Sequence, residues 1–288
     1  MSRLGFLIVT LTAFLVSLSS IFSRFAYDGG ANPQTLVLFR FLLFCFLYLL
    51  VVSITSKPIR LPGHKRFYVY LAGGFYTLGS GSLLASMFFL PVSLAIVIFY
   101  TYPIITLAGE KILAREMPRP LEIGCFILAF LGLILALKID ANSANPTGIG
   151  LAIMASLGMS ASYLVSEKKL IEIAPFLLTF HLALTGLVIM ALYIIFTNSF
   201  NPGKLISSNL SFVFLASLSF ATAFFCMFKG INLIGAVNTA MILNLEPVFT
   251  IGLAFAFLNE SLSGSQFIGA ALVLLAIIIV QRYHHRRS

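Results

Sequence analysis

The chain has 288 residues, of which 60% are hydrophobic and only 9% charged, with a formal net charge of +9. Ordinary soluble domains are about 45–50% apolar and about 25% charged. A soluble fold of this length cannot bury so much apolar surface, so part of the chain must face lipid. The composition excludes a soluble enzyme, a nucleic-acid-binding module, a disordered chain and a disulfide scaffold. We therefore expect a lipid bilayer around the chain and no nucleic-acid partner.

Ten apolar stretches are long enough to cross a membrane, since a helix needs about 20 residues to span the hydrocarbon core. They are Leu4–Phe22, Thr35–Thr55, Phe67–Leu90, Val92–Glu110, Leu121–Lys138, Thr147–Val165, Pro175–Phe196, Ser211–Phe228, Gly235–Leu258 and Ser265–Gln281. The first apolar run is too long for a typical signal peptide, so we interpret it as a retained helix. Helices satisfy their own backbone hydrogen bonds in lipid, so the pattern predicts an all-helical membrane bundle.

The basic residues predict the orientation, because cytoplasmic loops collect Lys and Arg. With the N-terminus inside, all but four of the 18 basic residues fall on the cytoplasmic side. Arg24, Lys138 and Lys204 fall outside, and Arg40 lies within a span. We expect a multi-pass protein with both termini in the cytoplasm, and a basic tail over residues 282–288 that contacts anionic lipid heads.

The two halves of the chain are similar when the sequence is shifted by 144 residues. The identities in the fourth and ninth spans and just after them are Ile98 with Ile242, Pro103 with Pro247, Thr106 with Thr250 and Glu116 with Glu260. We predict two five-helix repeats, over residues 1–140 and 147–281. An odd number of helices inverts the second repeat, and inverted repeats are typical of secondary transporters with a substrate site near the midplane.

Three segments carry a resemblance to a known family. They are residues 236–250 followed by 257–263, residues 93–106 through Glu116, and Phe39-Arg40-Phe41. These resemble the EamA repeats of the drug/metabolite transporter superfamily, although Arg115 and Asn259 stand where the family usually has glycine. The resemblance implies a ten-helix carrier of the bacterial inner membrane that works by alternating access. It also implies a central cavity surrounded by the first, third, fourth, sixth, eighth and ninth spans, and no particular substrate.

Two charged residues lie within spans, where a charge is costly and marks a candidate functional site. Glu246 is at the centre of the ninth span. Because a low dielectric disfavours its charged form, it is a candidate for proton coupling; alternatively it locks a helix kinked at Pro247 against a neighbour. Arg40, in the second span, either anchors that helix by reaching toward the outer surface or pairs with a carboxylate or a substrate acid.

Uncharged polar residues on the expected cavity helices form a candidate substrate-binding set: Tyr76, Ser80, Tyr100, Tyr102, Ser160, Tyr163, Asn238 and Asn244. Each could instead form hydrogen bonds between helices. His181 is either a proton relay or a neutral, hydrogen-bonded residue. Cys45, Cys125 and Cys226 lie in apolar runs without metal-ligand spacing, so we expect buried thiols, no metal site and no cofactor.

The expected function is secondary active transport of a small organic metabolite, such as an amino acid or a related compound, by efflux coupled to protons or to exchange. Import of a vitamin, nucleoside or methylated metabolite by the same fold is an alternative, as is a helper protein that transports nothing. The chain contains no His-Glu-x-x-His, paired catalytic aspartates or Gly-x-Ser-x-Gly, so we do not expect an enzyme. We expect a monomer or a homodimer.

Overall fold

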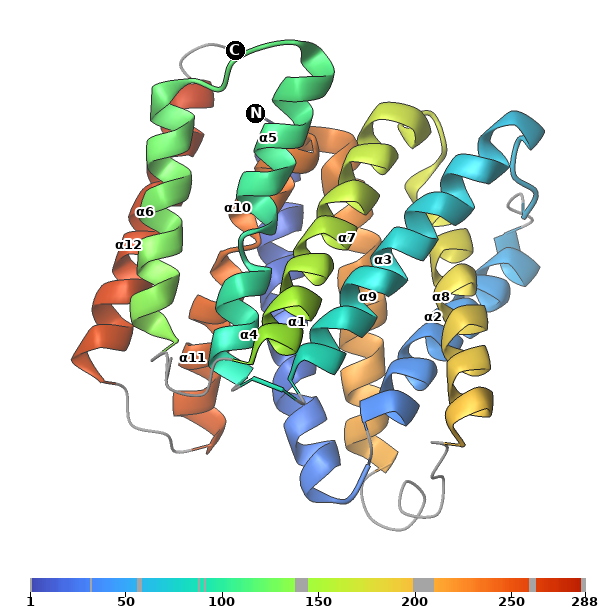
Figure 1. Ribbon diagram of the computed structural model, residues 1–288. Helices are drawn as coiled ribbons and strands as arrows, with labels where there is room; N and C mark the ends of the chain where they lie inside the picture. The colour runs from blue at the N-terminus through green and yellow to red at the C-terminus, as the bar shows by residue number, and fades with distance from the viewer. Residues whose placement is uncertain are drawn as a thin grey trace.

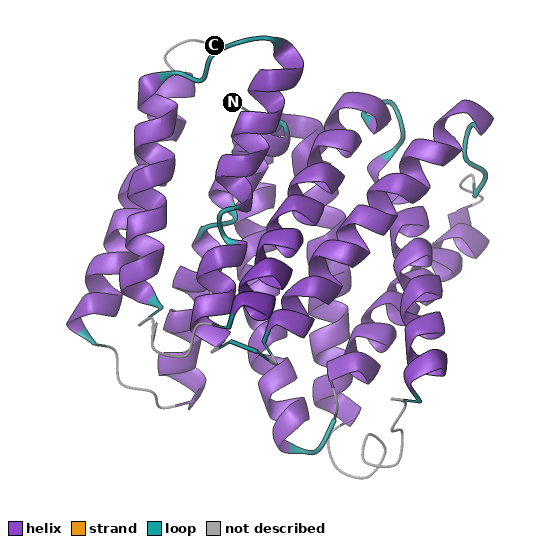
Figure 2. Ribbon diagram, in the orientation of Figure 1, coloured by secondary structure: helices purple, strands orange, loops and turns teal. Residues whose placement is uncertain are grey.

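The protein is a bundle of α-helices (Figures 1 and 2). A computed structural model describes residues 2–31, 33–55, 59–87, 89–90, 92–137, 145–198, 210–258 and 263–285. Within these ranges there is no β-strand, and a single turn of 3-10 helix, η1 (Gly63–Lys65), precedes α3.

Twelve α-helices form the ten spans, because the fourth and the ninth spans are each divided in two. The first half of the chain contains α1 (Arg3–Asp28), α2 (Pro33–Thr55), α3 (Arg66–Ser86), α4 (Val92–Phe99), α5 (Tyr102–Ala114) and α6 (Pro120–Ala136). The second half contains α7 (Pro146–Leu170), α8 (Pro175–Thr197), α9 (Leu210–Ile234), α10 (Ala236–Ile242), α11 (Leu245–Leu258) and α12 (Gly264–His285). The predicted all-α class with ten spans is confirmed.

Seven spans within the described residues are long and apolar enough to cross a membrane by length and composition alone. Helices α6 and α12 contribute shorter apolar runs. The remaining span, helix α3, carries several glycines and hydroxyl side chains. The fourth and ninth spans both break near the middle, where the sequence indicated a kink at Pro247. The sixth and eighth spans also continue further than predicted, which places Lys229 inside α9 rather than at its end.

The two halves have the same order of helices. Moving the bounds of α4 and α5 along by 144 residues gives 236–243 and 246–258, close to those of α10 and α11. The most extensive helix contacts obey the same relation, because α3 packs on α7 as α1 packs on α9. In Figure 1, α1 begins at the upper edge of the bundle and its counterpart α7 begins at the lower edge. The two five-helix repeats are therefore inverted, as predicted.

Small residues let the repeats approach closely where α3 crosses α7. A methyl group on Gly158 would lie 2.9 Å from both the backbone nitrogen of Gly79 and the carbonyl oxygen of Phe75. Glycines 132 and 269 make a similar contact between α6 and α12. Because helices in lipid gain little hydrophobic energy from association, such close backbone contact is a main source of packing energy.

Charged residues of the described chain pair mainly at one end of the bundle, which we call the basic end. The ion pairs there are Lys65–Glu172 at 3.2 Å, Lys111–Glu116 at 3.3 Å and Lys168–Glu110 at 3.9 Å. The first residues of α1 lie at this end too (Figure 1). Several residues of the sequence argument, Lys57, Lys138, Lys204, Glu260, Arg286 and Arg287, lie outside the described residues.

The α3–α7 crossing gives a test of the packing. Gly158→Ala should lower the free energy of unfolding by about 1–3 kcal/mol, because the new methyl group overlaps backbone atoms that cannot move aside easily. The free energy is measured by SDS titration of the protein in mixed micelles. Gly150→Ala on the same helix is the control, since its methyl group would meet nothing within 4 Å. Equal effects of the two substitutions would contradict the close crossing.

Candidate functional site

Both broken spans divide directly before a proline. Helices α4 and α5 are separated at Tyr100–Thr101, before Pro103, and α10 and α11 are separated at Leu243–Asn244, before Pro247. Proline has no N–H, so it leaves the carbonyl four residues earlier without its helical partner. Within a bilayer such a carbonyl needs another donor, because there is no water to supply one.

The structure supplies that donor differently in the two repeats. Pro103 frees the carbonyl of Phe99, which accepts a hydrogen bond of 2.6 Å from the Ser156 hydroxyl on α7. Pro247 frees the carbonyl of Leu243, which accepts from the backbone N–H of Glu246 at 2.9 Å. Both breaks are therefore satisfied, one by a neighbouring helix and the other by a tight turn.

The residue before each proline is held across the repeat interface. The carbonyl of Tyr102 accepts from the Ser160 hydroxyl at 2.9 Å, and the carbonyl of Glu246 accepts from the Ser17 hydroxyl at 2.8 Å. The Ala13 carbonyl in α1 lies at the same distance from the Ser17 hydroxyl, so the two acceptors share its one hydrogen. Ser160 is on α7, the first helix of the second repeat, and Ser17 is on α1, the first helix of the first repeat. Each repeat thus holds the broken span of the other; we call these two bonds the reciprocal clamps.

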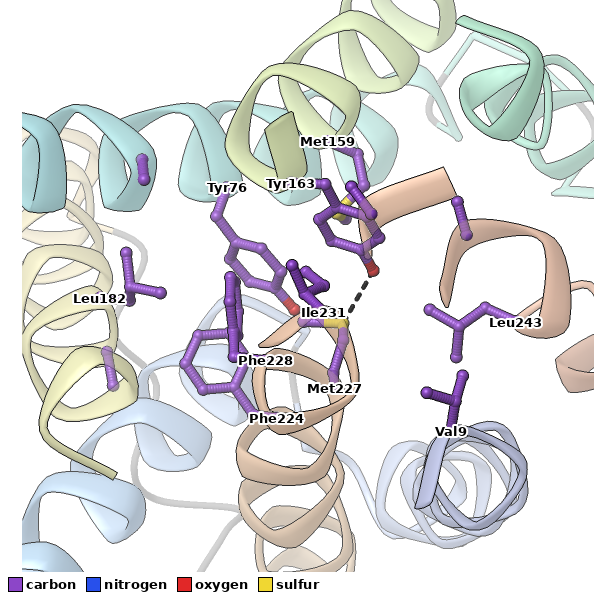
Figure 3. Close-up of a cluster of buried hydrophobic side chains, with 14 of the residues drawn as sticks. Val9, Tyr76, Met159, Tyr163, Leu182, Phe224, Met227, Phe228, Ile231 and Leu243 are labelled. Carbon is purple, nitrogen blue, oxygen red and sulfur yellow. Dashed lines mark hydrogen bonds between the residues drawn. The ribbon is translucent and has the colours of Figure 1, made fainter. Parts of the chain in front are cut away.

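Four buried tyrosines surround the breaks: Tyr76 from α3, Tyr100 and Tyr102 from the α4–α5 break, and Tyr163 from α7. Ring centroids are 5.8 Å apart for Tyr100–Tyr102 and for Tyr102–Tyr163. The Phe228 ring lies between Tyr76 and Tyr163, at 6.2 and 6.3 Å, and Figure 3 shows the Tyr163 hydroxyl directed at the Met227 sulfur. We call Tyr76, Tyr100, Tyr102 and Tyr163 the tyrosine cluster.

The carboxylate of Glu246 faces this cluster. Its Oε2 accepts a hydrogen bond of 2.9 Å from the Tyr100 hydroxyl. It also interacts electrostatically with Tyr76, Tyr102 and Tyr163. The Glu246 carboxyl group and the four phenols of the tyrosine cluster, which come from both repeats, therefore lie in the same part of the interior.

Arg40 approaches the same region from α2. Its Nη2 donates to the Ser23 hydroxyl at 2.7 Å, and its guanidinium lies 4.9 Å from the centroid of the Phe220 ring. Its Nε is buried and has no hydrogen-bond partner. Arg40 and Glu246 interact electrostatically but do not form an ion pair with each other. The interior therefore holds an arginine and a glutamate side chain that do not contact each other directly.

The other predicted site residues contact backbone. Ser80 donates to the Thr77 carbonyl at 3.2 Å within α3, and Asn238 of α10 donates to the carbonyl of Ile234, the last residue of α9, at 2.7 Å. Asn244, inside the α10–α11 break, donates to the Met241 carbonyl at 3.0 Å. Ser160 is a clamp residue. The structure thus brings the tyrosines, Glu246 and Arg40 together. The described polar contacts of the other four predicted residues are to backbone or to a neighbouring hydroxyl, and these residues are Ser80, Ser160, Asn238 and Asn244.

His181 lies in α8 and its Nε2 is 2.8 Å from the carbonyl oxygen of Ile59. A carbonyl can only accept, so Nε2 carries the hydrogen of this bond. Its Nδ1 is buried without a partner. This geometry favours the neutral, hydrogen-bonded reading of His181 over the relay.

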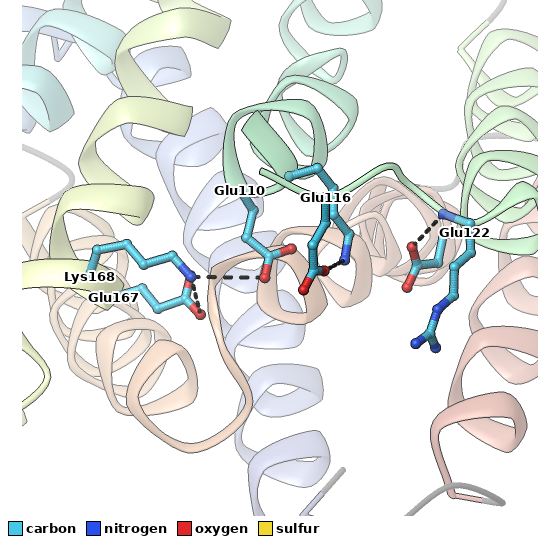
Figure 4. Close-up of polar contacts among 7 residues, drawn as sticks. Glu110, Glu116, Glu122, Glu167 and Lys168 are labelled. Atoms are coloured by element: carbon cyan, nitrogen blue, oxygen red, sulfur yellow. Dashed lines mark hydrogen bonds and ion pairs between the residues drawn. The ribbon is translucent and has the colours of Figure 1, made fainter. Parts of the chain in front are cut away.

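Sequence reasoning missed a small polar cavity of about 130 Å³ at the basic end. Glu110, Glu122, Glu167 and Asn238 contribute to its lining. Lys168 lies 3.9 Å from Glu110 and 3.8 Å from Glu167, joining α5 to α7 across the repeat interface (Figure 4). Among the described residues, no group of three or more His, Cys, Asp or Glu could hold a metal ion. Sequence reasoning also missed the clamp residue Ser17, because the first span carries several hydroxyl side chains and only the packing of α1 against α11 distinguishes Ser17 from the others.

Comparison with known proteins decides the family. The EamA-like transporter family matches the chain twice, over residues 3–138 and 146–282. The chain belongs to this family. It is therefore a multi-pass membrane protein of a transporter family, and the resemblance noted in the sequence is confirmed.

Individual relatives are more distant. Protein PecM of Dickeya dadantii is 26% identical over 190 residues, which cover 65% of this chain and 60% of that protein. The uncharacterized transporter sll1319 of Synechocystis is 26% identical over 207 residues, covering 69% and 61%. The matches thus span about 60% of the length of these relatives. A crystal structure with 16% identity aligns with a TM-score of 0.81 over 96% of this chain and 98% of its own, which shows the fold alone.

The bond between Tyr100 and Glu246 can be tested by removing one hydroxyl. Tyr100→Phe should lower the free energy of unfolding by about 1.5–3 kcal/mol, the range for a hydrogen bond to a charged group. Tyr102→Phe is the matched control, because the Tyr102 hydroxyl makes only a long bond of 3.4 Å to the Ala240 carbonyl. The free energies are compared by SDS titration. A larger loss for Tyr102→Phe than for Tyr100→Phe would reject the assigned bond.

Proposed function

We propose that the protein is a secondary active transporter that moves a small organic metabolite, an amino acid or a related compound, out of a bacterial cell across the inner membrane. The observation that carries the proposal is the separated charge pair, Arg40 and Glu246, beside the tyrosine cluster at the junction of two inverted repeats. Inverted-repeat transporters bind their substrates at such a junction, beside discontinuous helices.

The chemistry of the site fits a solute with charges of both signs. An ammonium group would be attracted by the Glu246 carboxylate and by the faces of the surrounding tyrosines, since aromatic rings attract cations. An acid group would be attracted by Arg40, whose buried Nε has an unused hydrogen. Because the two side chains do not neutralise each other directly, both remain available to a bound solute.

Glu246 is proposed as the coupling residue. It is an ionisable side chain in the interior, and its bond to Tyr100 links its charge state to the α4–α5 break. Gain or loss of a proton at Glu246 would change the hydrogen bond that joins the two broken spans. The reciprocal clamps join each broken span to the opposite repeat. We therefore propose that the repeats move against each other at these two spans during alternating access.

The orientation follows from the charge distribution. We propose that the basic end faces the cytoplasm, with both chain termini on that side, because Lys and Arg are retained there. The ion pair Lys168–Glu110 then joins the repeats on the cytoplasmic side. The protein acts as a carrier rather than an enzyme, and as a monomer or a homodimer.

Transport by purified protein in proteoliposomes tests the proposal. A thermal-shift screen against amino acids, nucleosides and vitamins first identifies a ligand, because a ligand stabilises the state that binds it. We expect saturable flux of that ligand, and Glu246→Gln should abolish flux driven by a pH gradient while sparing exchange.

The control is Glu116→Gln, which removes an exposed carboxylate at the basic end and should leave coupling unchanged. Absence of saturable flux for every compound in the panel would overturn the transporter proposal. Flux that is still driven by the pH gradient in Glu246→Gln would reject Glu246 as the coupling site and leave the transporter proposal standing.

A further inference from the structure

A large hollow lies between α3 and α8, in the half of the bundle away from the basic end. Its volume is about 720 Å³, and its walls come mainly from the later turns of these two helices, with Tyr27, Gln34 and Leu151 contributing from neighbouring elements. In Figure 1 these turns form the lower parts of α3 and α8. Since α3 belongs to the first repeat and α8 to the second, the hollow lies between the repeats.

Glycines explain why this space is not filled by side chains. Four glycines of α3 fall into two kinds. A methyl group on Gly73 would lie 2.8 Å from Thr185 of α8, and one on Gly79 would lie 3.0 Å from the backbone of Met159. A methyl group on Gly74 or Gly81 would meet nothing within 4 Å. The first pair brings helices together, whereas the second pair leaves gaps between the side chains on the α3 wall of the hollow.

The hollow opens toward the surface that faces lipid. Leu78, Ile189 and Tyr193 contribute to its lining and are 45%, 39% and 48% exposed. Thr77 and Met190 line it from inside and are only 4% and 7% exposed. The hollow is thus continuous with the apolar outer surface of a chain that spans the membrane.

The lining of the hollow is mainly apolar, and its polar side chains are those of Tyr27, Gln34, Thr77, Ser82 and Tyr193. The Thr77 hydroxyl already donates to the Gly73 carbonyl at 2.8 Å. Water occupies a cavity only where it finds two to four polar partners, so this space does not suit water. An empty apolar space is also unfavourable, because its lining loses dispersion contacts. A flexible apolar chain from the surrounding bilayer satisfies both conditions.

We propose that the α3–α8 hollow binds one acyl chain of a membrane phospholipid. The volume falls within the range of about 300–1,000 Å³ found for ligand pockets in proteins. The bound chain contacts one helix from each repeat, on the side away from the basic end. Neither Glu246 nor the tyrosine cluster lines the hollow, whereas Tyr27 of its lining interacts electrostatically with Arg40.

The absence of tryptophan in the chain gives a clean test, since a single introduced Trp is then the only one in the protein. The probe is phosphatidylcholine with brominated acyl chains, which quenches Trp fluorescence on contact. Met190→Trp places the reporter on the inner wall of the hollow. Two references lie on the same helix: Leu192→Trp on the exposed surface and Phe180→Trp in the buried core.

In brominated vesicles we expect Met190→Trp to lose most of its emission, as Leu192→Trp does, while Phe180→Trp stays bright. Adding Gly81→Leu to the Met190→Trp protein fills the hollow and should restore the emission to the Phe180→Trp level. Gly150→Leu is the matched control, because a side chain at Gly150 meets nothing and that residue is not part of the lining. It should leave the quenching unchanged.

Emission from Met190→Trp as bright as that from Phe180→Trp would overturn the proposal, as would quenching that Gly81→Leu does not relieve. Quenching by an added apolar solute but not by brominated lipid would also overturn it, and would assign the hollow to the solute's path. If Met190→Trp does not fold, Thr77→Trp on the inner wall takes its place, and the effect of Gly81→Leu on its quenching carries the same two outcomes.

Discussion

A carbonyl freed by proline inside a bilayer must find a donor, and this requirement organises the centre of the molecule. Pro103 and Pro247 each break a span near its middle, where water cannot help. The Ser156 hydroxyl and a tight turn satisfy the freed carbonyls. Ser17 and Ser160 then hold the residues before the prolines from the opposite repeat. Contacts from the opposite repeat therefore stabilise both breaks, although the carbonyl freed by Pro247 is satisfied within its own repeat.

The arrangement of the site follows from these breaks. Tyr100 and Tyr102 flank the first break, and Glu246 is the residue before the second proline, so unwinding the spans brings them together. The hydrogen bond from Tyr100 to Glu246 joins the two breaks directly. Arg40 adds a positive charge without forming an ion pair to Glu246. The proposed solute site thus lies where two helices could not continue, with Arg40 contributed by α2.

Much of this could be predicted from the sequence. Apolar runs predicted the ten spans, and the recurrence of Pro103 at Pro247 predicted the inverted repeats. Glu246, Tyr100 and Tyr102 were candidates because ionisable and aromatic groups at mid-depth are unusual. These signals are local, since each depends on residue type and on position within one span.

Other features depend on how helices cross, which one sequence does not reveal. The role of Ser17 became visible only when α1 was placed against α11. Ser80 was a candidate for the solute site, yet its hydroxyl bonds to the Thr77 carbonyl in its own helix, as such side chains often do. Asn238 bonds to the Ile234 carbonyl and lines the cavity at the basic end instead. The hollow beside Gly81 was also hidden, because the same residue type at Gly79 serves close packing. Residue type sets what a side chain can do, and the crossing geometry decides which option it takes.

The reciprocal clamps are tested most directly by removing their hydroxyls. Ser17→Ala and Ser160→Ala should each lower the free energy of unfolding by about 0.5–1.5 kcal/mol in SDS titrations, the net value of a hydrogen bond. Ser20→Ala is the reference, because the Ser20 hydroxyl donates only to Val16 in its own helix. The clamps predict a clearly larger loss at Ser17 and Ser160 than at Ser20. Equal losses at all three positions would contradict them.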